Sequence, residues 1–219
     1  MSGEYSAQRF VERLAGLPVP VPMGRVFGLA KEFIDMPPSE IERLLDRDEH
    51  LARVGALSVM DKQARRNSTP EDRRTELYEL YLRRPDRIDT WDLVDLGAPY
   101  VIGRYLFDKP TDVLYELARS TSPWERRTAI VACLYFVRQD QVDDTFAIAE
   151  ILVHEEHDLV RKAVGGLLRE AGKKDRTRLL RFLDRYAAVM PRVILRYAIE
   201  HLSDEQRTHY RSLKPTSAP

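Results

Sequence analysis

The sequence has little of what a secreted, membrane-bound or cysteine-dependent protein needs. Its 219 residues include a single cysteine, Cys133. No disulfide can therefore form within the chain, and we expect an inert thiol packed in a helix. No apolar run approaches the roughly 18 residues of a membrane span. The first residues also lack the basic and apolar regions of a signal peptide. We therefore expect a cytoplasmic protein with no membrane partner.

Patterns that accompany cofactor or nucleophile chemistry are missing as well. The chain has no glycine-rich loop of the kind that holds phosphates, and no cysteine arranged as a nucleophile. The run His154-Glu155-Glu156-His157 invites a metal interpretation. Its histidines lack the spacing of zinc proteases, however, and no further ligand is obvious. We expect no metal and no other cofactor, and a metal at this run is the less favoured alternative.

The sequence also has no excess of either charge, with 35 Lys and Arg against 35 Asp and Glu. Net charge therefore argues neither for nor against nucleic acid, and the distribution of charge matters more. From Arg161 to Arg196 there are eleven basic residues and three acidic ones. Such a stretch is typical either of a phosphate-binding surface or of solvated, arginine-rich helix faces.

No segment has a convincing strand pattern, and nearly the whole chain is expected to be helical. Apolar residues recur at helical spacing over residues 23–34, for example. Ser39 is predicted to cap the next helix, with Glu42 closing a capping box. Thr69 is predicted to cap a further helix, with Pro70 as its start signal, that runs to about Arg84.

A four-residue pattern recurs along the chain: a cation, a spacer, a small residue, and an apolar or small residue. It stands at Arg53-Val54-Gly55-Ala56, Arg127-Thr128-Ala129-Ile130, Arg161-Lys162-Ala163-Val164 and Arg196-Tyr197-Ala198-Ile199. The first residues of these runs are 74, 34 and 35 positions apart. The interval of 74 is two periods, so one member is missing near position 90. Helix pairs repeating every 35–45 residues or so are typical of HEAT-like solenoids.

We therefore predict an all-α fold, an α-solenoid of HEAT-like helical repeats with a concave groove lined by the inner helix of each pair. A single repeat domain is expected over residues 1–212, followed by a disordered C-terminal tail over 213–219. Nothing suggests an oligomer, so we expect a monomer.

Near position 90, where a member of the pattern is missing (the vacant slot), the sequence reads Thr90-Trp91-Asp92-Leu93-Val94-Asp95. On a helix Trp91 and Asp95 are four residues apart and share one face, while Leu93 and Val94 turn into the core. A charge seldom lies beside a Trp on a core face unless something pairs with it or uses it. The pair is therefore the candidate for a site on an inner helix.

Three motifs together carry a family resemblance: Trp91-Asp92-Leu93-Val94-Asp95, then Trp124-Glu125-Arg126-Arg127, then Lys162-Ala163-Val164-Gly165. In their order and spacing they resemble the AlkD family of DNA alkylation repair glycosylases, from about Val21 to His201. The resemblance implies that the concave groove grips duplex DNA carrying alkylated purines. It further implies excision of cationic bases such as 3-methyladenine and 7-methylguanine without base flipping. The expected enzyme acts as a monomer in the bacterial cytosol or nucleoid, with no obligate protein partner.

Carried over residue by residue, the resemblance assigns three roles. Asp95 matches the catalytic aspartate, Trp91 the groove tryptophan, and Arg127 the arginine near the phosphate of the lesion. Further DNA contacts are expected from the cations Arg53, Arg126, Arg161, Lys162 and Arg196. Salt bridges between repeats are the alternative for these cations. Likewise, Asp95 has the alternative of an ordinary helix residue paired with an arginine, and Trp91 that of a core residue.

Two positions differ from the family pattern. Gly166 stands where the family commonly has a second groove tryptophan, and Val26 where the best-known members have a tyrosine. Phe27 is a candidate to replace that tyrosine by a one-residue shift. Because Gly166 enlarges the expected groove, we predict tolerance of bulkier N3 and N7 adducts.

The chemistry fits these residue types. An N3- or N7-alkylated purine is already a cationic leaving group, so no general acid is required. Cleavage builds positive charge on the deoxyribose, and a fixed carboxylate stabilises that charge while it orients or deprotonates the attacking water. The face of Trp91 adds a cation–π contribution on the order of 0.5–2 kcal/mol. The sequence thus predicts a DNA glycosylase. The alternatives are a non-catalytic HEAT-like protein for damaged or branched DNA, and a protein-scaffolding solenoid.

Overall fold

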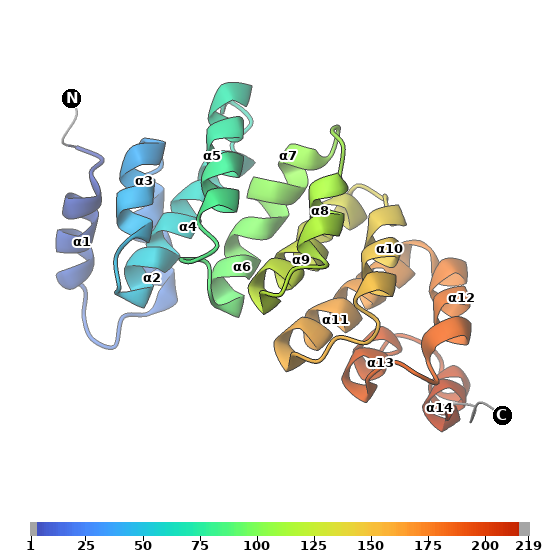
Figure 1. Cartoon of the computed structure of the whole chain (residues 1–219). Helices are drawn as coiled ribbons and strands as arrows, with labels where there is room; N and C mark the ends of the chain where they lie inside the picture. The colour runs from blue at the N-terminus through green and yellow to red at the C-terminus, as the bar shows by residue number, and fades with distance from the viewer. Residues whose placement is uncertain (1–3, 215–219) are drawn as a thin grey trace. The chain divides into compact units, whose positions relative to one another are not determined.

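The computed structural model of the chain describes residues 4–214 (Figure 1). Every regular element in this range is a helix and no strand occurs there, which confirms the predicted all-α class. None of the helices in this range is long and apolar enough to cross a membrane. The chain divides into two compact units, unit 1 ending at Asp108 and unit 2 beginning at Lys109. Of the tail predicted over 213–219, residues 215–219 lie outside the described range.

Unit 1 is built from helices in two layers (Figure 1). α3 packs against α1 and α5 in the first layer, and α4 packs against α2 and α6 in the second. α6 continues directly into a π-helical turn, η1, and then α7. The elements are α1 (Ala7–Ala15), α2 (Met23–Glu32), α3 (Pro38–Leu45), α4 (His50–Arg65), α5 (Glu71–Arg83), α6 (Trp91–Gly97), η1 (Ala98–Gly103) and α7 (Arg104–Leu106).

Unit 2 repeats the same two-layer arrangement. α8, α10 and α12 form its first layer, and α9, α11 and α13 form its second, where α11 packs between α9 and α13. These paired helices, with those of unit 1, give the predicted HEAT-like repeats. The elements are α8 (Asp112–Leu117), α9 (Pro123–Arg138), α10 (Asp143–Ile151), α11 (Asp158–Lys174), α12 (Arg176–Tyr186), α13 (Arg192–Ala198) and α14 (Asp204–Ser212).

The cation and the small residue of each recurring four-residue pattern lie within the first two turns of a second-layer helix. The patterns fall on α4, α9, α11 and α13, and the run Trp91–Asp95 falls on α6, the second-layer helix of the vacant slot. The small residue of the pattern allows close packing at Gly55, where an added Cβ would lie 2.5 Å from the ring of Phe10. The repeat in the sequence therefore corresponds to a repeat in space.

Two predicted helix caps are wrong. Ser39 lies inside α3, which begins at Pro38 without a side-chain cap, and Glu42 is used elsewhere, as described below. The hydroxyl of Thr69 donates to the carbonyl of Gln63 at 2.7 Å, and α5 likewise has no side-chain cap. Prolines lie at both helix starts, Pro37 and Pro38 at α3 and Pro70 immediately before α5, because their fixed φ suits a helix start and they carry no N–H to be left unpaired.

The single cysteine is packed as expected. Cys133 lies on α9 with no exposed surface, its Sγ lies 3.4 Å from the carbonyl oxygen of Ala129, and burial raises the pKa of the Cys133 thiol. A thiol that stays protonated is a poor nucleophile and a poor metal ligand.

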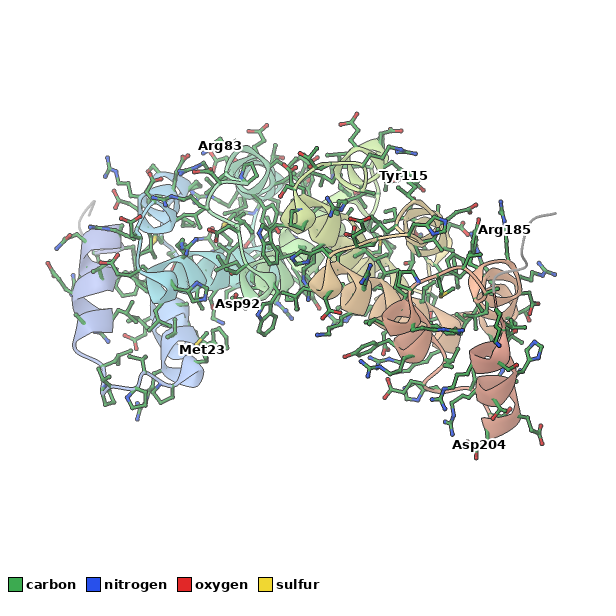
Figure 2. All side chains as sticks on the ribbon, turned by 60° about the horizontal axis from the view of Figure 1, so that its bottom comes forward. Met23, Arg83, Asp92, Tyr115, Arg185 and Asp204 are labelled. Carbon is green, nitrogen blue, oxygen red and sulfur yellow. The ribbon has the colours of Figure 1, made fainter. Side chains whose placement is uncertain are left out.

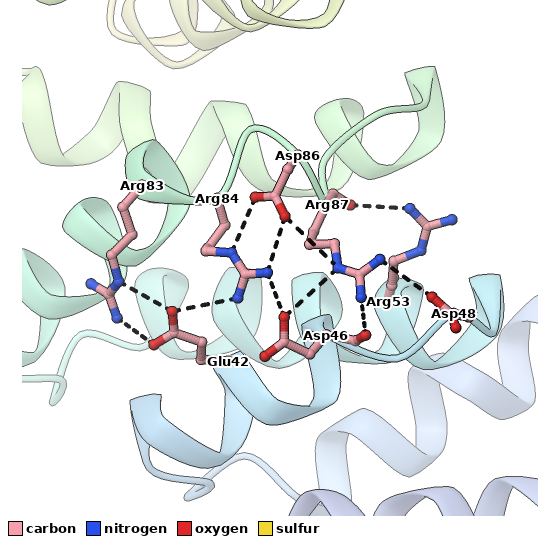
Figure 3. A network of polar contacts seen from close by, with 8 residues as sticks. All are labelled: Glu42, Asp46, Asp48, Arg53, Arg83, Arg84, Asp86 and Arg87. Carbon is pink, nitrogen blue, oxygen red and sulfur yellow. Dashed lines mark hydrogen bonds and ion pairs between the residues drawn. The ribbon is translucent and has the colours of Figure 1, made fainter.

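A network of ion pairs joins consecutive helix pairs of unit 1 (Figure 3). Arg84 is its centre: its guanidinium contacts Glu42 at 3.5 Å, Asp86 at 3.1 Å, and Asp46. Arg83 adds a bond of 2.7 Å to Glu42. These arginines hold the pKa of all three carboxyls below the usual range, chiefly through Arg83 at Glu42 and Arg84 at Asp46 and Asp86.

The network makes a pH-dependent contribution to stability. Because the folded-state pKa values are lowered, this contribution is complete above the ordinary carboxyl range near pH 4 and is lost as the pH falls through the lowered values. Solvent screening limits it to about 1–2 kcal/mol. We expect Arg84→Gln to lower the urea midpoint at neutral pH and to weaken its decline in acid, unlike Arg43→Gln, which removes one exposed pair. Parallel acid profiles for wild type and Arg84→Gln would contradict this.

Candidate nucleic-acid interface

The Trp91–Asp95 pair has the predicted placement on α6. The side chains of Leu93 and Val94 are fully buried, whereas Trp91 is 51% exposed and is one of few large apolar side chains open to solvent in the described range. Asp95, one turn further along the helix, is also exposed. The predicted division of faces is confirmed, and an indole and a carboxylate share a surface of unit 1. Trp91 is therefore not a core residue.

A histidine that the sequence did not single out fixes the start of α6. His50 Nε2 and Asp92 Oδ2 are 2.7 Å apart, and the Thr90 hydroxyl donates to Asp92 Oδ1 at 2.7 Å. Burial acts to raise the pKa of Asp92, but the bonds from Thr90 and His50 outweigh it and lower that pKa. An ionised Asp92 in the first turn also interacts favourably with the positive end of the helix dipole. The residue before the exposed Trp and the one after it are thus anchored to α4.

The helix changes its winding at Ala98, three residues after Asp95. Pro99 has no N–H, and its ring would clash with the carbonyl of Asp95 in a regular α-helix. The chain widens here into the π-helix η1, in which the N–H of Arg104 donates to the carbonyl of Pro99. Single π turns are frequent at functional sites. Pro99 within an otherwise helical pattern is the feature of the sequence that indicates this change of winding.

Arg53 makes a contact between repeats in this structure. Its Nη1 donates to Asp89 at 2.5 Å and to the carbonyl of Arg87 at 3.3 Å, and the side chain is 13% exposed. This is the salt-bridge alternative considered for the cations. A role for Arg53 toward phosphate stays a prediction that requires this pair to open.

Arg126 is bound even more completely, in unit 2. Its guanidinium forms two parallel bonds to Glu155, of 2.6 and 2.9 Å, and also donates to the carbonyls of Ser120 and Thr121, both at 2.9 Å. Glu155 is 3% exposed at its side chain and accepts the N–H of His157 at 2.8 Å. The run His154–His157 therefore positions the start of α11 around a buried carboxylate.

Loss of that carboxylate is expected to be costly. Burial acts to raise the pKa of Glu155, but Arg126 and the backbone N–H groups outweigh it and lower that pKa. Glu155→Gln leaves the Arg126 cation without its counter-charge, and we expect the free energy of unfolding to fall by about 3 kcal/mol. Urea unfolding would measure this, with the exposed Glu156→Gln as the control. Equal effects of the two substitutions would contradict the expectation.

Arg127 is the buried member of the predicted catalytic set. It is 7% exposed on α9, and its Nη1 donates to the carbonyl of Leu159 at the start of α11. This bond links two second-layer helices of unit 2. The expected phosphate contact of Arg127 is neither supported nor contradicted by it.

The remaining cations of the set lie on α11 and α13. Arg161 donates to the carbonyl of Glu155 at 2.6 Å, and Lys162 pairs with Asp158 of its own helix at 2.6 Å. The guanidinium of Arg196 lies 5.2 Å from the ring centre of Tyr197. Of the five cations, Lys162 and Arg196 have the local, same-helix contacts that a phosphate displaces most easily.

The burial and contacts of the positions that differ from the family pattern show which of them lie at the surface. Val26 has no exposed surface, so its side chain belongs to the core. Phe27 is half-buried, and the Lys62 ammonium lies 5.9 Å from its ring centre. A Cβ added to Gly166 would meet no heavy atom within 4 Å. Trp124 packs edge-on against His157, with ring centres 5.3 Å apart, as expected of a packing residue.

No group of three or more His, Cys, Asp or Glu side chains that can hold a metal ion occurs within residues 4–214. The acidic side chains of the candidate surface are Asp92 and Asp95, with His50 beside the first. What this surface offers chemically is a carboxylate next to an aromatic face.

Comparisons with known proteins identify the family and the fold. A family model described as DNA alkylation repair enzyme matches residues 13–202. Among solved structures, a predicted DNA alkylation repair enzyme from Enterococcus faecalis aligns with a TM-score of 0.64 over 92% of this chain and 96% of that chain, at 18% sequence identity. At that identity the likeness supports the fold alone. No curated protein matches.

Proposed function

The chain belongs to the DNA alkylation repair enzyme family, and from that premise we propose that it is a DNA glycosylase for cationic N3- and N7-alkylated purines. It would release these bases from duplex DNA in the cytoplasm as the first step of base excision repair, without flipping them into a pocket. The observation that carries the proposal is the exposed Trp91 one helical turn from the exposed Asp95, on a helix whose first turn is anchored.

Asp95 carries the chemistry in this proposal. The alkylated base leaves as a neutral purine, so the enzyme has no proton to supply to it. Positive charge grows on the deoxyribose, and a carboxylate held nearby stabilises it and takes a proton from the attacking water. The indole of Trp91 packs on the sugar, where its π face also favours the developing cation.

Cations are needed because Asp95 repels phosphate. We assign that role first to Lys162 and Arg196, whose present contacts lie within their own helices. Arg161 and Arg53 would contribute once their carbonyl or carboxylate partners exchange for phosphate oxygens. Arg126 is better regarded as a structural cation, since Glu155 and two carbonyls bind it. Arg127 keeps the role that the family resemblance assigns, near the phosphate of the lesion.

The open space at Gly166 bears on the range of substrates. A Cβ added to Gly166 would have no heavy atom within 4 Å, so the surface of unit 2 is open at this position. We propose that bulky N3 and N7 adducts are released faster than methylated bases, and equal or slower release would count against this. Phe27, with Lys62 beside its ring, is the candidate for the aromatic surface that Val26 cannot provide.

The proposal is tested with two duplexes of the same sequence, one with 7-methylguanine and one with O6-methylguanine. The first lesion is a cation and the second is neutral, so only the first has an activated leaving group. We expect Asp95-dependent release of 7-methylguanine and no release of the neutral base. Release of both, or of neither, would contradict the proposed mechanism.

A second candidate is a protein of the same fold that binds damaged or branched DNA without cleaving it. The absence of a side chain at Gly166 and the burial of Val26 favour it, because both reduce the aromatic surface available to hold a sugar. A steep salt dependence of DNA binding with no base release would support this alternative.

A further inference from the structure

The arginine-rich stretch of the sequence is divided between the two layers of unit 2. Arg178, Arg181 and Arg185 lie on α12 in the first layer, whereas Arg196 lies on α13 in the second. Two of the α12 arginines, Arg178 and Arg185, pair with acids of α10, Asp143 and Glu150. Arg196 instead faces a pocket between α13 and α14, and α14 brings further arginines to it.

This pocket is small, open and rich in guanidinium groups. Its volume is about 480 Å³, and its lining consists of Arg196, Tyr197, Glu200, Arg207 and Arg211. Three cations thus face one carboxylate. Arg207 and Arg211 are one turn apart on α14 and therefore point to the same side of that helix.

The carboxylate of the pocket, Glu200, already has an ion-pair partner that is not part of the pocket lining. Glu200 binds Arg169 of α11, so its charge is shared between that arginine and the pocket, and Arg196 also interacts electrostatically with Asp158 of α11. Arg207 pairs with Asp204 of its own helix, but the Asp204 side chain is 87% exposed, and such a pair is weak in water. Within the described residues, Arg211 has no ion-pair partner. The pocket is therefore electropositive, and its cations repel one another until an anion enters.

The geometry of the guanidinium groups is partly fixed in advance. Arg207 Nη1 donates to the carbonyl of Glu200 at 3.3 Å, and the Arg196 guanidinium lies against the ring of Tyr197. Arg192, at the start of α13, holds the chain after α14 through a bond of 2.9 Å to the carbonyl of Leu213. Fixed arginine forks match the oxygens of phosphate better than flexible lysines do.

We propose that the pocket of Arg196, Arg207 and Arg211 is a phosphate-binding site that holds the backbone of the DNA on α13 and α14. The inference rests on the proposed function in one respect, that duplex DNA is the ligand. It does not depend on whether the protein releases a base. Two sources can supply the phosphate, a diester within the duplex or a terminal phosphate at a DNA end. The pocket adds two residues, Arg207 and Arg211, to the cations expected from the sequence.

The experiment measures binding of a fluorescent undamaged duplex to the full chain by anisotropy, over a range of salt. We expect Arg207→Ala and Arg211→Ala each to weaken binding about tenfold and to reduce the slope of log affinity against log salt by about 0.9 for each lost phosphate contact. Arg181→Ala is the control, because Arg181 is exposed on α12 in the other layer. In Figure 2 the label Arg185 marks α12, the helix of the control residue, and the label Asp204 marks α14, the helix of Arg207 and Arg211.

The source of the phosphate is separated by the design of the DNA. If a backbone diester binds, lengthening the duplex strengthens binding to wild type more than to Arg211→Ala. If a terminal phosphate binds, the duplex with a 5′-phosphate binds more tightly than the 5′-hydroxyl form, and this difference vanishes in Arg211→Ala. Affinity and salt slope equal to wild type in Arg207→Ala and Arg211→Ala would overturn the proposal.

Base release is measured in parallel on an alkylated duplex. Below saturating DNA we expect Arg211→Ala to release the base more slowly, in proportion to its weaker binding, whereas Arg181→Ala, exposed on α12 and outside the pocket, releases it at the wild-type rate. Wild type that binds DNA through the pocket but releases no base would refute the proposed function and leave this inference standing. If the wild type releases the base and the pocket arginines contribute nothing to DNA binding, the inference is refuted and the proposed function stands.

Discussion

Asp95→Asn is expected to lower the rate of base release by about 10²–10⁴-fold, the range in which a positioned acid–base group contributes, while duplex binding stays nearly unchanged. The amide has the size of the carboxylate but cannot accept the proton of water or neutralise a growing cation. Asp95 is exposed on α6, so the substitution leaves the core intact. Single-turnover release of 7-methylguanine, together with anisotropy of the same duplex, measures both quantities.

The neighbouring carboxylate provides a matched control. Asp92 lies on the same helix but binds His50 and Thr90, so Asp92→Asn weakens the anchor of α6 without removing the proposed reacting group. We expect a modest loss of activity for Asp92→Asn and a severe loss for Asp95→Asn. A severe loss for Asp92→Asn with near-normal activity of Asp95→Asn would contradict the assignment.

Gly165→Ala is expected to lower the free energy of unfolding by about 3 kcal/mol, which is the upper part of the usual range for an overpacked core. A Cβ at Gly165 would lie 2.6 Å from the carbonyl oxygen of Ile194 and 2.7 Å from the Cβ of Tyr197. The carbonyl is backbone and cannot turn aside, so α11 and α13 must separate. Urea unfolding of the full chain measures the loss.

For the adjacent glycine, Gly166, we expect the substitution by alanine to raise the free energy of unfolding instead of lowering it. Gly166 lies on the same helix with no heavy atom within 4 Å of an added Cβ. Gly166→Ala should therefore stabilise the protein by about 0.5–1 kcal/mol, because alanine restricts the unfolded chain and suits a helix better than glycine. If both substitutions destabilise equally, the close contact of α11 with α13 is not the reason.

The fold was predictable from the sequence because its information is periodic. The four-residue pattern placed a cation and a small residue within the first two turns of α4, α9, α11 and α13, and the missing member near position 90 placed Trp91 on α6. Leu93 and Val94 indicated which face of α6 enters the core. The helix starts were also predictable, but the capping residues were not, since prolines take that place in α3 and α5.

The details of the site were harder to predict because they depend on contacts between distant residues. His50 and Asp92 are 42 residues apart and meet only when α4 packs beside α6. Arg126 and Glu155 are 29 residues apart, and no local pattern indicates that one buried carboxylate binds that arginine. Likewise, a pattern cannot tell a buried Val26 from a groove residue, because a one-residue shift on a helix changes the face.

The measurement that tests the central claim most directly is the release of free 7-methylguanine and 3-methyladenine from methylated duplex DNA by the wild-type chain, with DNA binding recorded on the same sample. The proposed function predicts release of both bases, lost in Asp95→Asn. Tight binding of the methylated duplex with no free base released would contradict it, and would make the chain a DNA-binding member of its family without glycosylase chemistry.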